Sequence, residues 1–279
     1  CTIITAKEIK ESQSAQASNL LEGTMGLSIQ KSQNGGGSPN LRGMEANRLL
    51  IIVDGIPLNT TIFRSGHVQN SATINPFFLE SAEVLFGPAS VAYGNGAMGG
   101  VLIFNTINPK NKTSNQFIQQ YESASNAVFT SYLANYMLKD IAFASGFSIK
   151  SFGNLKMGNN RIHGFNNWGN ESTITDQNIQ LETAYHQEDF FHKSLIKLTN
   201  HTFLLFNTQY ATSSNINRFD KLNDTKEGQR KYSHWYYGPQ KRFFQSIRLK
   251  NYTKKLLTDE SVITFAYQNL EESRHKQKT

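Results

Sequence analysis

A glycine-rich stretch between two strand-like runs constrains this chain most strongly. It extends from Leu79 to Thr106 and reads LESAEVLFGPASVAYGNGAMGGVLIFNT. The runs on either side of the glycines are rich in β-branched and aromatic residues, as strands are. Gly87 and Pro88 end the first run, and the later glycines permit a positive φ or a close backbone approach. The stretch therefore predicts two strands joined by a tight glycine-rich connection.

The same glycines form a G-x-G-x-x-G match at Gly94, Gly96 and Gly99. A dinucleotide site needs these glycines to follow a strand directly and to open a helix, with an acidic residue about 20 residues later. Here they enter a β-rich run, and polar Asn, Lys and Thr residues follow. A Rossmann enzyme is therefore only a minor alternative.

An earlier stretch, residues 39–59, contains the apolar run LLIIV followed by Asp54 and Gly55. Asp-Gly after such a run favours a tight turn between two strands. Nearer the N-terminus, Thr5 and Glu8 have the spacing of a capping box, which predicts the start of a helix.

Together the two stretches resemble the plug domain of TonB-dependent outer-membrane receptors. The residues that carry the resemblance are Arg42, Gly43, Arg48, Asp54, Gly55, Glu83, Gly87, Pro88, Tyr93, Gly94, Gly99 and Gly100. The resemblance implies structural roles for these residues, as turn anchors and in salt bridges between plug and barrel. Because a buried charge must be paired, a plug inside a polar barrel lumen would supply partners for its charged members.

The resemblance implies an α+β plug domain over residues 1–108, followed at 109–279 by antiparallel transmembrane β-barrel strands. Residues 140–152 show the alternation most clearly, with Ile141, Phe143, Phe147 and Ile149 separated by small or polar residues. Such alternation is typical of a strand with one face to lipid and one to a lumen. Further strands are expected at 127–139, 179–186, 194–199, 202–212, 243–252 and 262–270.

Short turns near residues 139, 200 and 258 alternate with long polar segments at 153–177 and 213–241, as periplasmic turns and extracellular loops do. A barrel that holds a plug needs about 22 strands. We therefore expect an incomplete barrel, a fragment that also lacks the energy-coupling box of the family. Cys1 is either a lipidated residue or the start of that fragment.

Candidate ligand contacts lie in two segments. The resemblance places an apical plug loop at residues 60–78, with Phe63, Arg64, His67 and Gln69 as candidates. A hydrogen-bonded loop histidine is the simpler interpretation of His67, and heme-iron ligation is the alternative. In the loop 213–241 the candidates are Arg218, Asp220, Trp235, Tyr236 and Tyr237. This loop resembles heme and iron receptors, although its aromatic residues also suit a girdle or packing at a strand end.

Composition excludes several function classes. The chain has 279 residues, one cysteine and a formal charge of +7. The only dense basic cluster, residues 229–242, lies among strand-like segments, so we expect no nucleic-acid partner. Nucleophile–base, paired-carboxylate and CxxC patterns are not evident, so we expect no enzyme. No intrinsic cofactor is expected, and a metal site stays open.

The resemblance implies a receptor in the bacterial outer membrane that takes up a scarce nutrient. Its partners would be TonB with the ExbB and ExbD energy source, outer-membrane lipid and the transported ligand. An iron source, as heme, a hemoprotein or a ferric siderophore, is the leading expectation. A SusC-like glycan or peptide importer and a cobalamin receptor are the alternatives within transport. A non-transport binding module with a plug-like fold is the alternative from another class.

Overall fold

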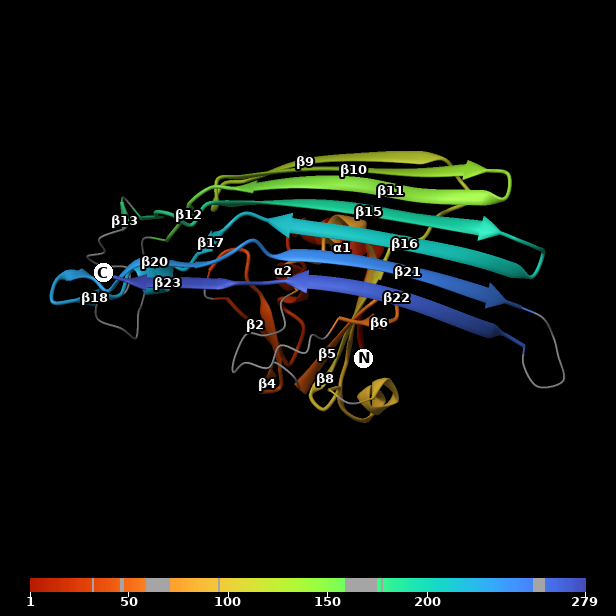
Figure 1. Cartoon of the computed structure of the whole chain (residues 1–279), viewed down its shortest axis with the longest axis horizontal. Coiled ribbons are helices and arrows are strands. Elements are labelled where there is room, and N and C mark those ends of the chain that lie inside the picture. Colours follow the sequence, from red (N-terminus) through yellow and green to blue (C-terminus); the bar gives the residue numbers. More distant parts are fainter. Residues whose placement is uncertain are drawn as a thin grey trace.

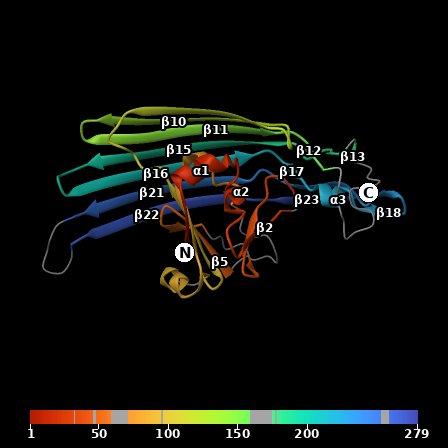
Figure 2. The same cartoon turned by 180° about the vertical axis from the view of Figure 1, so that it is seen from behind.

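The computed structural model describes residues 1–31, 33–45, 48–58, 71–94, 96–158, 175–176, 178–252 and 259–279. A long twisted sheet dominates the molecule, and the N-terminal domain packs against one of its faces (Figure 1). The view from behind shows the same arrangement, with helices α1 and α2 between the small domain's strands and the long sheet (Figure 2).

The N-terminal domain is built on a five-stranded sheet in the order β1-β7-β8-β5-β6. Its strands are β1 (Thr2–Thr5), β5 (Leu49–Val53), β6 (Ile56–Pro57), β7 (Leu79–Leu85) and β8 (Gly100–Thr106). Strands β5 and β8 are parallel, and the other neighbours are antiparallel. Every residue of β5 is buried, as expected for a continuous apolar run at the centre of a sheet.

Helices α1 (Ala6–Ser12) and α2 (Ala17–Leu21) pack on this sheet, and a second small sheet joins β2 (Leu27–Gln30), β3 (Ser38–Leu41) and β4 (Met44–Glu45). The predicted capping box is confirmed, because Thr5 and Glu8 bond each other's backbone at the start of α1. These hydrogen bonds to Thr5 lower the pKa of Glu8 below its ordinary value. The domain's core therefore forms between α1, α2 and the sheet.

The glycine-rich stretch is partly as predicted. Strands β7 and β8 do pair antiparallel, but their connection is not tight, because a 3-10 helix, η3 (Gly87–Tyr93), lies within it. The start of β8 requires a glycine, which is Gly100. It has a φ of 141°, and a Cβ there would lie 2.2 Å from Leu41 Cδ2 and 2.6 Å from the carbonyl oxygen of Leu85.

The long sheet has seven antiparallel strands in the order β22-β21-β16-β15-β11-β10-β9. Their bounds are β9 (Ser114–Glu122), β10 (Ala127–Leu138), β11 (Ile141–Phe152), β15 (Tyr185–Lys197), β16 (Thr202–Ser213), β21 (Lys241–Asn251) and β22 (Ser261–Glu271). Among the described residues β9 and β22 each pair on one side only, so the sheet is open. The predicted fold, a plug-like α+β domain followed by antiparallel barrel strands, is confirmed.

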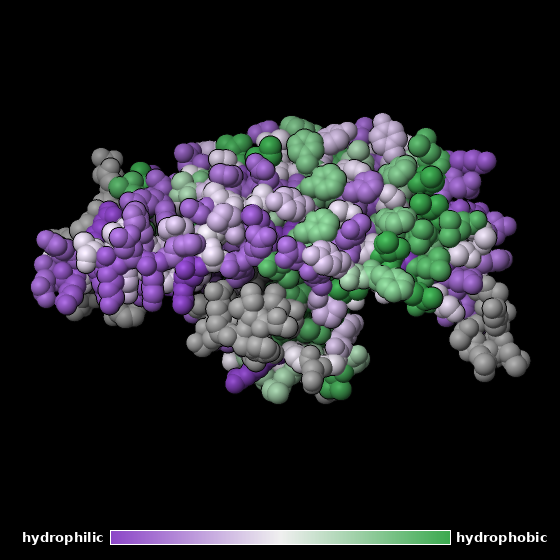
Figure 3. Space-filling view, in the orientation of Figure 1, coloured by the Kyte–Doolittle hydropathy of each residue, from purple (hydrophilic) through white to green (hydrophobic). Residues whose placement is uncertain are grey.

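The alternation predicted for residues 140–152 separates two faces in β11. Ala144 and Ser148 are fully covered on the face toward the N-terminal domain, whereas Phe147 and Ile149 are about half exposed on the other face. Figure 3 shows hydrophobic side chains gathered on this outer surface, with hydrophilic ones toward the ends of the long strands. The outer face is therefore the more apolar of the two, as expected for the lipid-facing side of the barrel that the sequence predicts.

A charge on the outer face tests this orientation. We expect Phe147→Arg to destabilise the full-length protein in a bilayer, lowering its free energy of unfolding by about 2–4 kcal/mol, because arginine is costly on the lipid face near the midplane. Ser151→Arg, on the same face nearer the strand end, should cost less. Urea titration of the vesicle-inserted protein measures both costs, and equal costs would contradict the assignment of this face to lipid.

Beyond one end of the long strands lies a polar extension (Figure 1). It contains the sheets β12-β14-β13, β17-β20-β23 and β18-β19 and the short helix α3 (Phe219–Leu222). The strands of the extension are β12 (Leu155–Lys156), β13 (Thr175–Asp176), β14 (Ile179–Gln180), β17 (Ile216–Asn217), β18 (Thr225–Lys226), β19 (Gln229–Arg230), β20 (Tyr232–Tyr237) and β23 (Arg274–Lys278).

Three strand predictions need correction. The strands expected at 179–186 and 194–199 are wrong, because one strand, β15, joins the end of the first to most of the second, and the start of the first is the separate short strand β14. Strand β9 was not predicted at all. The segment 213–241 is not a plain loop, because it folds into the strands and helix of the extension. The other predicted barrel strands lie within two residues of the observed ones.

Among the described residues, no helix is long and apolar enough to cross a membrane.

Candidate functional site: the contact between plug and wall

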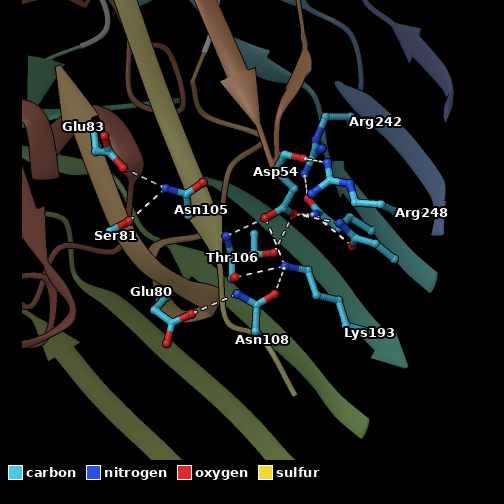
Figure 4. Close-up of polar contacts among 12 residues, drawn as sticks. Asp54, Glu80, Ser81, Glu83, Asn105, Thr106, Asn108, Lys193, Arg242 and Arg248 are labelled. Carbon is cyan, nitrogen blue, oxygen red and sulfur yellow. Dashed lines mark hydrogen bonds and ion pairs between the residues drawn. The ribbon is translucent and has the colours of Figure 1, made fainter. Parts of the chain in front are cut away.

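The N-terminal domain meets the long sheet through a buried polar network centred on Asp54 (Figure 4). Asp54 and Gly55 form the predicted two-residue turn between β5 and β6, with φ values of 51° and 81°. This pair of positive φ angles suits Asp-Gly, since glycine has no Cβ and aspartate tolerates the left-handed region. The turn carries the Asp54 carboxylate to the face of the long sheet.

Three side chains of the long sheet donate to this carboxylate. Lys193 Nζ on β15 lies 3.0 Å from Asp54 Oδ1, and the amides of Asn207 and Gln209 on β16 each lie 2.8 Å from Oδ2. Within its own domain the carboxylate also accepts from the backbone N–H of Thr106, at 2.9 Å, and from its hydroxyl, at 2.6 Å. Asp54 is thus held by both domains.

Lys193 uses its three N–H groups on the N-terminal domain and the chain that leaves it. Besides Asp54 it donates to the carbonyl of Thr106 at 3.0 Å and to Asn108 Oδ1 at 3.2 Å. Its side chain is 2 % exposed, so this is a buried ion pair. A buried charge of this kind depends on its partner, because removal of one member leaves the other uncompensated.

A second polar contact lies four residues earlier on β15. Asp189 pairs with Lys150 of β11 at 3.3 Å and accepts from Asn75 Nδ2 at 3.0 Å. Gln187 donates both to Asp189 and to the carbonyl of Ala72. Strand β15 therefore contacts the N-terminal domain at two places on one face.

An apolar contact lies between the polar ones. Phe78 ends the 3-10 helix η2 (Pro76–Phe78) and stacks on Phe191 of β15 with ring centroids 5.4 Å apart. Gly146 of β11 makes room for it, since a Cβ at that position would lie 2.6 Å from the ring. Leu133 and Ala144 complete the cluster. The sheet is shaped here to receive one aromatic side chain.

Arg242 of β21 is the least satisfied member of the network. It is 3 % exposed and donates from Nη2 to Gln209 Oε1 at 2.8 Å, whereas its Nε and Nη1 have no hydrogen-bond partner among the residues that the structure describes. Arg248 lies on the same face of β21, further along the strand, and donates to the carbonyl oxygen of Asp54 at 2.7 Å. Both cations face the Asp54 turn (Figure 4).

The other charged signature residues lie away from this network. Arg42 is exposed at a φ of 50°, with its guanidinium 4.8 Å from the Phe86 ring centre. Arg48 is exposed, and its carbonyl accepts from Gly99 N–H at 2.7 Å. Glu83 accepts from Asn105 Nδ2 within the domain. Asp54 alone of these four charged residues is seen to reach the long sheet in the described part of the chain.

The signature glycines support the backbone of turns. Gly43, Gly87 and Gly94 have positive φ values, and Gly99 has no room for a Cβ beside Met44. Tyr93 is 42 % exposed, and Pro88 lies in η3. The roles predicted for the signature residues, and a domain boundary at residue 108, stay predictions; β8 ends at Thr106 and β9 begins at Ser114.

The candidate ligand residues of the second loop are in the extension. Trp235 is buried with Phe219 and Leu222, and the Arg218 guanidinium lies 4.6 Å from its ring centre. Burial opposes the charge of Arg218, but its hydrogen bond and ion pair with Asp220 outweigh this and raise its pKa. These neighbours therefore cover the Trp235 ring and leave little of it exposed.

Tyr236 and Tyr237 differ in their surroundings. Tyr236 stacks on His275 of β23 at 4.8 Å, and Tyr237 meets Trp235 edge to face. Contact of these residues with a ligand stays a prediction. The apical candidates Phe63, Arg64, His67 and Gln69 lie outside the described residues. Within the described ranges, no three His, Cys, Asp or Glu side chains are grouped to hold a metal ion.

Sequence reasoning missed the polar network around Asp54. Lys193, Asn207, Gln209 and Arg242 are spread over three strands, and only the sheet register brings them together. The sequence did contain a signal of this network. Polar side chains alternate with apolar ones in these strands and occupy the face toward the N-terminal domain.

Comparison with known proteins agrees with this arrangement. Residues 1–101 match the family model described as TonB-dependent Receptor Plug Domain. The heme transporter BhuA of Brucella ovis is 35% identical over 111 residues, which are 38% of this chain and 16% of that protein. The vitamin B12 transporter BtuB of Vibrio vulnificus is 25% identical over 235 residues, which are 84% of this chain and 34% of that protein.

Among solved structures, the ferric enterobactin receptor of Pseudomonas aeruginosa in complex with enterobactin superposes with a TM-score of 0.70 at 20% identity. The match covers 98% of this chain and 41% of that receptor, and it shows a shared fold. The chain thus spans well under half the length of each of these proteins. Residues 1–101 thus match the plug domain of TonB-dependent receptors, and this domain is seated on an open wall of antiparallel strands whose fold is shared with a solved receptor.

Proposed function

We propose that this chain forms the plug and the adjoining barrel wall of an outer-membrane receptor that takes up an iron source. The observation that carries the proposal is the seating of the plug on the wall through the buried Asp54 network. A domain held by polar contacts inside a wall with an apolar outer face suits a gated passage through a membrane. The wall forms one side of this passage, and the plug fills the passage itself.

The nature of the cargo rests on the relatives. The Brucella protein is named a heme transporter, and the Pseudomonas structure is a ferric enterobactin receptor. Heme, a hemoprotein or a ferric siderophore is therefore the proposed cargo, with no resident cofactor. The vitamin B12 transporter aligns with more of this chain, so cobalamin is the second candidate.

Movement of the plug needs energy that an outer membrane does not supply. We assign this role to TonB with ExbB and ExbD, acting on the plug from the periplasmic side. The outer face of the wall would contact outer-membrane lipid, and its exposed Phe147, Ile149, Phe190 and Phe265 suit that environment. The function proposed is transport, without a chemical step.

Uptake by cells tests the proposal. A strain that lacks the complete gene should lose energised uptake of radiolabelled hemin or ferric siderophore, and restoring the gene should return it. Cells without TonB should bind the ligand at the surface but not import it. Labelled cyanocobalamin, measured in parallel, decides between the two candidates. Uptake that is the same with and without the gene for all three ligands would contradict the proposal.

A further inference from the structure

The wall contains an oxyanion site that the plug itself fills. The occupant is the Asp54 carboxylate, which is held by Lys193 Nζ, Asn207 Nδ2 and Gln209 Nε2 at 2.8–3.0 Å. These donors come from two neighbouring strands and are themselves buried. Since Asp54 belongs to the plug, the site would be vacated when the plug moves.

The site has more donors than the carboxylate uses. Arg242 adjoins it through its bond to Gln209, and its Nε and Nη1 have no partner in the described part of the chain. A small cavity of about 10 Å³ borders Arg242, Asp189 and Gln209 and reaches Thr73 and Asn75 of the plug. A buried guanidinium with two unsatisfied N–H groups is costly unless a ligand or water satisfies them. Arg242 therefore leaves two N–H donors next to the carboxylate site, beside a space with room for about one water molecule.

The charges on the plug-facing side of the wall also favour an anionic ligand. Lys150, Lys193, Arg242 and Arg248 face the plug, and Asp189, the carboxylate that the wall contributes beside them, already pairs with Lys150. When the plug withdraws, Lys193 would lose its acceptors on Asp54 and Thr106, and Arg248 would lose the backbone carbonyl of Asp54. Guanidinium and ammonium groups so exposed favour carboxylate, phosphate or other oxyanion ligands.

We propose that cargo passing the plug binds in this wall site in place of the Asp54 carboxylate, and that the cargo is anionic, with carboxylate or comparable oxyanion groups. The inference rests on the proposed transport function, because it requires the plug to withdraw. It adds a residue-level site, made of Lys193, Asn207, Gln209 and Arg242, and a charge class for the cargo. Exchange of the Asp54 carboxylate for an oxyanion of the cargo would leave Lys193, Asn207 and Gln209 with an acceptor while the plug is withdrawn.

Chemical rescue tests the site without any transport. In purified full-length protein, Asp54→Ala should vacate the site, and acetate should then raise the thermal unfolding midpoint. Chloride at the same concentration should not. Wild-type protein and Asp54→Asn, whose amide still fills the space, should not respond. Adding Arg242→Met to Asp54→Ala should weaken acetate binding about tenfold, the effect of losing a charged hydrogen bond. No response to acetate, or an equal response in the wild type, would overturn the site.

Arg242 offers a second test that keeps Asp54 in place, because its hydrogen bond within the described residues goes to Gln209 of the wall. In cells, Arg242→Met should leave surface binding of hemin unchanged and lower its energised uptake about tenfold, while Arg242→Lys should restore most of it. Lys241→Met is the matched control, since Lys241 points outward and pairs with Glu271. Normal uptake by Arg242→Met would refute the site's role in passage. Loss of uptake in the wild type as well would instead refute the proposed function.

Discussion

Asp54→Ala is expected to loosen the plug from the wall and to lower the plug's free energy of unfolding by about 3–5 kcal/mol. The reason is the state of Lys193, which would keep a buried charge without its carboxylate. Asn207 and Gln209 would each lose an acceptor as well. Hydrogen exchange of the amides in β5 and β8, in the full-length protein, measures this free energy by mass spectrometry.

Two control variants separate charge from shape. Asp54→Asn preserves most of the volume but removes the charge, so we expect a loss nearly as large as that of Asp54→Ala. Glu11→Ala removes another plug carboxylate, whose ion pair with Lys7 is 3.7 Å long and exposed. That change should cost less than about 1 kcal/mol. Equal losses for Glu11→Ala and Asp54→Ala would show that the Asp54 network has no special role.

Phe78→Ala is expected to lower the same unfolding free energy by about 3–5 kcal/mol. Phe78 is 3 % exposed and fills the space between Gly146 and Phe191 on the wall. Alanine would leave a cavity that the strands cannot close, because their backbones are fixed in the sheet. Hydrogen exchange of β5 and β8 again gives the loss.

The complementary change is on the wall. Gly146→Val should displace the Phe78 ring and release the plug, although the substitution suits a strand by itself. Tyr93→Ala is the matched control in the plug, because Tyr93 is 42 % exposed and should cost little. A stable plug in Gly146→Val would mean that Phe78 does not seat against β11.

The parts of the structure that local sequence determines could be predicted. The Asp54–Gly55 turn follows from the φ preferences of its two residues, and the capping box of Thr5 and Glu8 follows from spacing. The two faces of β11 follow from its period of two. Each of these features depends on residues that are adjacent or nearly adjacent in the chain.

The site itself depends on contacts far apart in the sequence. Lys193 and Asp54 are brought together only when the plug packs on the wall, so no local pattern identifies their pairing. Strand β15 was mispredicted for a related reason. Its middle, Gln187 to Lys193, was not predicted as a strand, and it contains the charged residues Asp189 and Lys193, which are paired on the face toward the plug.

A double-mutant cycle between Asp54 and Lys193 tests the central claim most directly, namely that the plug is fastened to the wall by this buried pair. The plug's unfolding free energy is measured by hydrogen exchange in the wild type, Asp54→Ala, Lys193→Met and the double variant. We predict a coupling energy above about 1 kcal/mol, with Lys193→Met costing much less when Asp54 is already absent. Losses that simply add would contradict the account.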